Sequence, residues 1–186
     1  VEDRRSWKKR LVIAILASLA FTYTLFVYGP FEVYIKNISY YTFSFNDLMW
    51  PIILLGLGIF VVLTIIMTLL RGKIFNYVIS AVFSTTLCSY VQCYFLKNDL
   101  GSLDGSAIKW EEMTTNVIIN LAIWAVIFLI PYVIQYFSHK LWRRVVTFVS
   151  ALLIIMQSAG LIELFVKNDL VDVVSDGYLS NSTIYE

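Results

Sequence analysis

Five long apolar runs constrain this chain more than any other feature of its sequence. They lie at residues 11–28, 49–70, 74–95, 115–137 and 145–166, and each holds 18 or more residues. An α-helix needs about 20 predominantly apolar residues to cross the hydrocarbon core of a bilayer. Only 15% of the 186 residues are charged, against about 25% in a typical soluble domain. The sequence therefore predicts an all-α, polytopic membrane protein with five transmembrane helices.

The basic residues predict the orientation of these helices. Ten of the fourteen Lys and Arg residues lie before the first run, between the second and third, or between the fourth and fifth. They are Arg4, Arg5, Lys8, Lys9, Arg10, Arg71, Lys73, Lys140, Arg143 and Arg144. Because Lys and Arg concentrate on the cytoplasmic side of a membrane, the N-terminus is predicted to be cytoplasmic and the C-terminus extracytoplasmic. The first run then acts as an uncleaved signal anchor that stops at Tyr28-Gly29-Pro30.

Several small or imino residues predict how individual helices behave. Pro51 falls in the first turn of the second span, where a missing N–H costs little. Pro131 lies inside the fourth span and is expected to kink it, with the freed carbonyl met by a neighbouring helix. Ser80, Ser84 and Cys88 recur every four residues in the third span. Such a ridge lets helices approach closely in lipid, so this helix is expected to be central.

The segments between the runs have distinct characters. Residues 31–47 alternate aromatic or apolar side chains with polar ones, which indicates short extended segments at the interface, as an external hairpin or a half-buried loop. Arg71-Gly72-Lys73 predicts a tight basic turn. Residues 138–144 predict a second basic turn, and it holds His139, the only histidine. Residues 167–186 are polar and acidic and are expected to form an extracytoplasmic linker.

Polar residues inside the spans lie toward their outer ends and form the main candidate site. They are Gln92, Asn116, Asn120, Gln157 and Glu163. Polar groups in hydrocarbon are costly and usually face the interior of a bundle. One hypothesis is a polar pocket suited to a lipid headgroup. The other is interhelical hydrogen bonding that serves packing alone, and the sequence leaves both open.

The loop after the third span is the second candidate. Asp99 and Asp104 lie among glycines, and oxygen ligands of this kind suit a hard cation. The spacing does not match the calcium-loop pattern, which favours a solvated acidic loop. No phosphate-binding loop, zinc pattern or nucleophile motif is present in the sequence. The sequence therefore assigns no catalytic residue, no cofactor-binding residue and no metal ligand, and the net charge of +1 gives no reason to expect nucleic acid as a partner.

Much of this chain resembles a known protein family. The run Tyr-Val-Gln-Cys-Tyr-Phe-Leu-Lys-Asn-Asp-Leu-Gly-Ser-Leu-Asp-Gly at 90–105, with Ile108-Lys109-Trp110 after it, is similar to the membrane portion of bacterial sulfatase-like proteins. These resemble lipoteichoic acid synthases and related enzymes of the alkaline phosphatase superfamily. The segments at 26–34, 45–48 and 176–180 fit the same pattern. In that family five helices precede an extracytoplasmic catalytic domain.

The resemblance implies a membrane domain at 1–166 and a linker at 167–186 that leads to a soluble domain. The chain would anchor and orient a sulfatase-like hydrolase or phosphoglycerol-type transferase in the plasma membrane of a bacterial cell envelope. Its partners would be membrane lipids and a lipid-linked or envelope-polymer substrate. Any divalent metal would belong to the catalytic domain, and no cofactor is expected here. The alternative is a self-contained small membrane protein, a transporter subunit or assembly partner, without catalysis.

Overall fold

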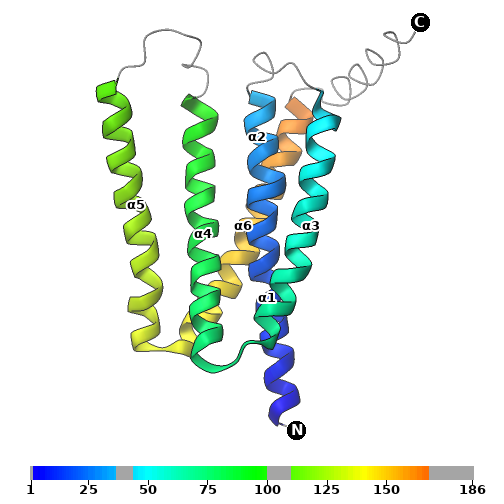
Figure 1. Cartoon of the computed structure of the whole chain (residues 1–186), viewed down its shortest axis with the longest axis vertical. Coiled ribbons are helices and arrows are strands. Elements are labelled where there is room, and N and C mark those ends of the chain that lie inside the picture. The colour runs from blue at the N-terminus through cyan, green and yellow to red at the C-terminus, as the bar shows by residue number, and fades with distance from the viewer. Residues whose placement is uncertain (1, 37–43, 100–109, 168–186) are drawn as a thin grey trace, which may run out of the picture.

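The computed structural model describes residues 2–36, 44–99 and 110–167, and all elements in these ranges are helices (Figure 1). The elements are α1 (Glu2–Tyr23), the π-helical turn η1 (Thr24–Tyr28), α2 (Gly29–Lys36), α3 (Phe45–Leu69), α4 (Gly72–Asp99), α5 (Trp110–Phe137) and α6 (His139–Lys167). Five helical stretches in these ranges are long and apolar enough to cross a membrane, one for each predicted run. The all-α class and the five predicted helices are confirmed.

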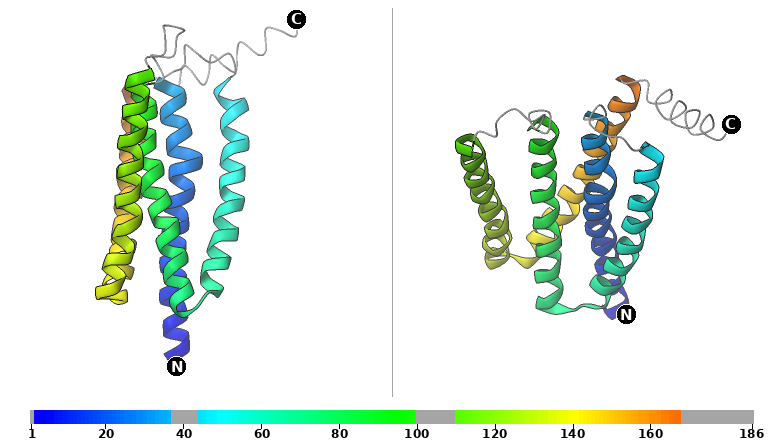
Figure 2. Two further views of the ribbon diagram at one scale, coloured as in Figure 1. Left: turned by 60° about the vertical axis from the view of Figure 1, so that its left-hand side comes forward. Right: turned by 45° about the horizontal axis from the view of Figure 1, so that its top comes forward.

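The helices form one bundle with two distinct ends (Figures 1 and 2). The N-terminus, the α3–α4 connection and the α5–α6 connection lie at one end, which we call the basic end. The last residues of α2, α4 and α6 lie at the other, the far end. Helices α1 and α4 are the most buried and α5 the least. The exposed surface of α3 and α5 is largely apolar, as expected of helices that face lipid.

The first membrane-spanning stretch continues past the predicted stop at Tyr28-Gly29-Pro30. Pro30 has no N–H, and its ring crowds the carbonyl one turn earlier. The chain adapts by widening: the Gly29 N–H donates to the carbonyl of Thr24, five residues back, which forms η1. The helix then continues as α2 to Lys36. The predicted stop is therefore wrong, because a π-turn accommodates Pro30 without ending the helix.

The predicted extended segments at 31–47 are also wrong where the structure describes them. Phe31, Tyr34 and Ile35 are buried in α2, and their spacing of three and four residues is the helical period. Of the residues that made up the polar half of this alternation, Glu32 and Tyr34 are themselves buried, so the alternation does not separate a buried face from an exposed one. Residues 37–43 lie outside the described residues.

Helix α3 begins earlier than predicted. The backbone N–H of Asp47 donates to Ser44 Oγ at 3.3 Å, and Ser44 Oγ donates to Asp47 Oδ2 at 2.6 Å. Ser44 is therefore the N-cap of α3, and this start places Pro51 in the second turn of α3, not the first. At the other end, the chain turns after α3 as predicted, but the turn is formed by Leu70 and Arg71, and Lys73 already belongs to α4. Helix α4 begins at Gly72, whose φ of 61° is in the left-handed region that favours glycine.

The predicted basic turn at 138–144 is helical except for its first residue. Ser138 alone separates α5 from α6, and its Oγ accepts the N–H of Leu141 at 3.2 Å, as an N-cap does. The prediction of a loop is wrong because this cap starts α6 at His139. As a result, Arg143 is held on a helix face and not on a mobile turn.

The small-residue ridge of α4 is buried as predicted, and it meets the proline of α5. Ser80, Ser84 and Cys88 are all less than 5% exposed. Ser84 Oγ donates to the carbonyl of Ile127 at 3.3 Å. Ile127 lies four residues before Pro131, so its carbonyl is the one that the missing proline N–H leaves free. The predicted contact of that carbonyl with a neighbouring helix is confirmed.

Candidate functional site

The residues predicted as a polar pocket occupy different environments. Gln157 is fully buried, Gln92 and Asn120 are half-buried, and Glu163 is exposed. The side chain of Asn116 lies outside the described residues. Helices α5 and α6, which carry Asn120 and Glu163, lie apart at the far end (Figure 1), so the structure does not bring these two residues together. The side chains of Asp99 and Asp104, the predicted loop site, lie outside the described residues.

Gln157 belongs to a hydrogen-bond network at the π-turn. Its Nε2 donates to Thr24 Oγ1 at 2.8 Å, and the Thr24 hydroxyl has two acceptors in reach, Gln157 Oε1 at 3.1 Å and the Ala20 carbonyl at 2.8 Å. The residues next to this pair in the sequence, Tyr23 and Ser158, share a hydrogen bond of 3.1 Å between their hydroxyl groups. These contacts join α6 to the first membrane-spanning stretch. They favour the packing hypothesis for Gln157, and lipid binding by the other residues stays a prediction.

A buried carboxylate at the far end escaped the sequence analysis. Glu32 is 5% exposed, and the Tyr28 hydroxyl donates to its Oε1 at 3.0 Å. The ring of Tyr28 stacks on that of Tyr90, with centroids 5.9 Å apart. The spacing of four residues between Tyr28 and Glu32 was the available signal. It was missed because residues 31–47 were interpreted with a period of two.

A polar hub ties α4, α5 and α6 together near the basic end. Ser80 accepts hydrogen bonds from Trp142 Nε1 at 2.8 Å and from Gln135 Nε2, and it donates to the carbonyl of Asn76 at 2.7 Å. All four residues are buried. Buried polar groups need partners, and here each residue supplies one for another. The hub fixes the start of α6 against α4.

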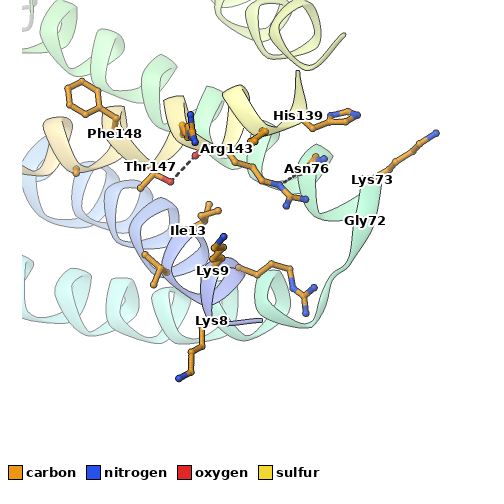
Figure 3. Close-up of a pocket in the computed structure, with 15 residues that line it drawn as sticks. Lys8, Lys9, Ile13, Gly72, Lys73, Asn76, His139, Arg143, Thr147 and Phe148 are labelled. Carbon is orange, nitrogen blue, oxygen red and sulfur yellow. Dashed lines mark hydrogen bonds between the residues drawn. The ribbon is translucent and has the colours of Figure 1, made fainter. Parts of the chain in front are cut away.

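Arg143 is positioned by this hub. Its Nε donates to Asn76 Oδ1 at 2.8 Å, and its Cζ lies 5.2 Å from the centroid of the Phe75 ring. An arginine that is held through Nε and an aromatic face keeps its guanidinium plane in one orientation. Figure 3 shows this guanidinium beside Asn76, with Lys9 and Ile13 of α1 on the other side of the space.

Arg143 lines a cleft of about 1170 Å³ at the basic end (Figure 3). We call it the basic cleft. Seven of its lining residues are Lys or Arg: Lys8, Lys9 and Arg10 from α1, Lys73 from α4, and Lys140, Arg143 and Arg144 from α6. His139 also lines it, and no Asp or Glu of the described side chains does. The sequence analysis found these residues as a topology signal but did not bring them together, because it placed the residues of α6 in a loop.

The described side chains do not include three His, Cys, Asp or Glu residues close enough together to hold a metal ion. What the bundle offers chemically is therefore cationic hydrogen-bond donors at the basic end and a buried tyrosine–carboxylate pair at the far end. Comparison of the chain with protein-family models, curated proteins and solved structures found no match. A function must therefore be argued from the residues, their geometry and the resemblance in the sequence.

Proposed function

We propose that this chain anchors and orients an extracytoplasmic sulfatase-like hydrolase or phosphoglycerol-type transferase in a bacterial plasma membrane. The observation that carries the proposal is the odd number of candidate membrane crossings among the described residues, which is five. It places the N-terminus and the last residues of α6 at opposite ends of the bundle (Figure 1). A soluble domain joined beyond α6 would therefore lie across the membrane from the N-terminus.

The charge distribution supports the orientation. The ten basic residues that predicted a cytoplasmic N-terminus all belong to the basic end, where α1, α4 and α6 begin. Lys and Arg near helix ends favour the cytoplasmic side. The far end, which holds the described parts, at 26–34, 45–48 and 90–99, of the segments that resemble the sulfatase-like family, would then be extracytoplasmic.

The packing supports an orienting role for α6. A domain joined to α6 is oriented only if α6 is fixed against the other helices. The Gln157–Thr24 and Tyr23–Ser158 hydrogen bonds hold the middle of α6 to the first membrane-spanning stretch. The ring of Phe165 packs on Phe31 of α2, with centroids 4.9 Å apart, close to the end of α6. These contacts hold α6, to which such a domain would be joined, against the first membrane-spanning stretch.

Cysteine labelling of the full chain in intact cells tests the orientation. In a background with Cys88 and Cys93 replaced by Ala, Glu186→Cys should react with a membrane-impermeant maleimide. Arg71→Cys, at the exposed α3–α4 turn, should react only after the cells are made permeable. The reverse pattern would overturn the proposed orientation and with it the extracytoplasmic anchor.

The reading frame downstream of Glu186 tests the anchoring role itself. A further soluble α/β domain with a Ser or Thr nucleophile and metal-binding carboxylates is the expected result. A stop codon shortly after Glu186 would refute the anchor and favour the self-contained membrane protein, a transporter subunit or an assembly partner.

A further inference from the structure

The basic cleft concentrates positive charge beyond what the rest of the chain would suggest. The chain has fourteen Lys and Arg residues and a net charge of +1, yet seven of those fourteen line this one cleft with no described carboxylate among them. Like charges gathered in this way repel one another, and the repulsion is greater where apolar walls lower the local dielectric. An anion that enters the cleft relieves that repulsion.

Arg10 distinguishes the cleft from a surface array of lysines. It lines the cleft but is only 8% exposed. Its Nε is covered and has no hydrogen-bond partner within the described part of the chain, and its Nη1 donates a long hydrogen bond of 3.4 Å to Ser6 Oγ. A buried guanidinium without a counter-charge is costly. A bound anion would supply the counter-charge that the described side chains do not.

Arg143 provides a second cation, half-buried and in a fixed geometry. Asn76 and the ring of Phe75 hold its guanidinium, so little side-chain freedom is lost when it binds. The planar fork of arginine matches the oxygens of a phosphate, which it can contact with two parallel hydrogen bonds. The starts of α4 and α6, at Gly72 and His139, also lie in the cleft, and helix N-termini favour anions.

The wall that runs toward the middle of the bundle is apolar. Val12 and Ile13 of α1 and Phe148 and Ala151 of α6 line it, and Val12 and Phe148 are more than half exposed. In a membrane, such side chains meet acyl chains. The cleft thus has cations at its mouth and an apolar surface next to them. A phospholipid at the membrane interface has the matching arrangement, a phosphate followed by acyl chains.

We propose that the basic cleft binds the phosphate group of an anionic phospholipid, with an acyl chain along Val12, Ile13 and Phe148. Arg143 and Arg10 contact the phosphate from inside, and the lysines form the rim. The lipid belongs to the leaflet at the basic end. The proposal goes beyond the anchoring function and does not rest on it, since the cleft would bind lipid equally in a self-contained membrane protein.

Native mass spectrometry of the full chain released from detergent micelles tests the proposal. The probes are phosphatidic acid and phosphatidylcholine with the same acyl chains, titrated separately. Phosphatidic acid should bind at one saturable site with at least tenfold higher affinity than phosphatidylcholine. Arg143→Gln should weaken it by about tenfold, as expected for the loss of a charge-assisted hydrogen bond. If Arg143→Gln does not fold, Lys140→Gln with Arg144→Gln, both at exposed positions, should weaken it similarly.

Arg71→Gln is the matched control. It removes the same charge at the same end of the bundle, but Arg71 does not line the cleft, so affinity should change less than twofold. Equal loss in Arg71→Gln and the cleft variants would mean diffuse attraction and would overturn the site. Equal binding of the two lipids would overturn the preference for an anionic lipid, because phosphatidylcholine also has a phosphate group but no net charge. Full competition by millimolar inorganic phosphate would show a soluble anion to be the ligand and would overturn the lipid assignment.

Discussion

The contact between Gly56 and Phe26 offers a sharp test of the packing. Gly56 is buried in α3 where that helix meets η1. A Cβ at Gly56 would lie 2.6 Å from Phe26 Cβ and 3.0 Å from its Cγ. To restore an ordinary contact of 3.4 Å, the two backbones must separate by about 0.8 Å, because a Cβ cannot rotate away. Overpacking of this kind typically costs about 1–3 kcal/mol. The entropic gain of replacing a helix-interior glycine, about 0.5–1 kcal/mol, offsets part of this cost, and we expect Gly56→Ala to be destabilised overall.

Gly58 is the matched control on the same helix. It is exposed, and a Cβ there would have no heavy atom within 4 Å. Replacing it with Ala removes the entropic penalty of glycine in a helix, about 0.5–1 kcal/mol. Because Gly56 lies in the same helix and gains the same entropic benefit, the two variants should differ in unfolding free energy by the overpacking cost alone, about 1–3 kcal/mol.

The measurement is unfolding of the purified protein in mixed micelles as the mole fraction of sodium dodecyl sulfate increases, followed by tryptophan fluorescence. Gly58→Ala should unfold at or above the mole fraction of the unmodified chain, and Gly56→Ala clearly below it. If Gly56→Ala is as stable as Gly58→Ala, then α3 does not approach η1 as closely as the structure shows. The reasoning from the Phe26 contact would then be wrong.

Three further predictions concern hydrogen bonds between helices, and the same unfolding assay checks each. Ser84→Ala should lower the free energy of unfolding by about 1 kcal/mol. The loss should be much smaller in a Pro131→Ala background, because the new N–H of residue 131 can bond the Ile127 carbonyl within α5. Equal losses in the two backgrounds would refute the contact. Gln157→Leu and Thr24→Val should be coupled by about 0.6–1.7 kcal/mol in a double-mutant cycle, and additive effects would contradict the network. Ser80→Ala leaves two buried N–H donors without an acceptor, and each should lower the free energy of unfolding by about 1–3 kcal/mol. Ser80→Thr keeps the hydroxyl and should lower it less; an equal loss would contradict the role of the hydroxyl.

The number and position of the helices could be predicted from the sequence because hydrophobic length dominates in a membrane chain. A run of about 20 apolar residues has few alternatives to a spanning helix. The same holds for the ridge at Ser80, Ser84 and Cys88, whose period of four residues is visible without any tertiary information. The contact at Pro131 followed from a simple requirement, because a carbonyl freed by proline in hydrocarbon must find a donor.

The helix ends could not be predicted as well, since they depend on polar contacts of single residues. The caps at Ser44 and Ser138 each start a helix earlier than hydropathy indicates. The π-turn before Pro30 lets a helix pass a residue that usually ends one. Each of these features is decided by one or two hydrogen bonds, and hydrophobic periodicity carries no information about them.

The basic cleft was not predicted, because the same residues were interpreted as a topology signal. A topology signal needs only positive charge near a helix end, and exposed Arg71 fulfils that need. It gives no reason to bury Arg10 or to hold Arg143 between Asn76 and Phe75. Burial of a cation lowers the stability of the fold unless an anion is close enough to compensate its lost hydration. The burial of Arg10 therefore requires an explanation other than the orientation of the chain in the membrane. The two roles can be separated: neutralising Arg71 or Arg143 removes equal charge from the topology signal, but only the change at Arg143 should weaken the binding of an anionic lipid.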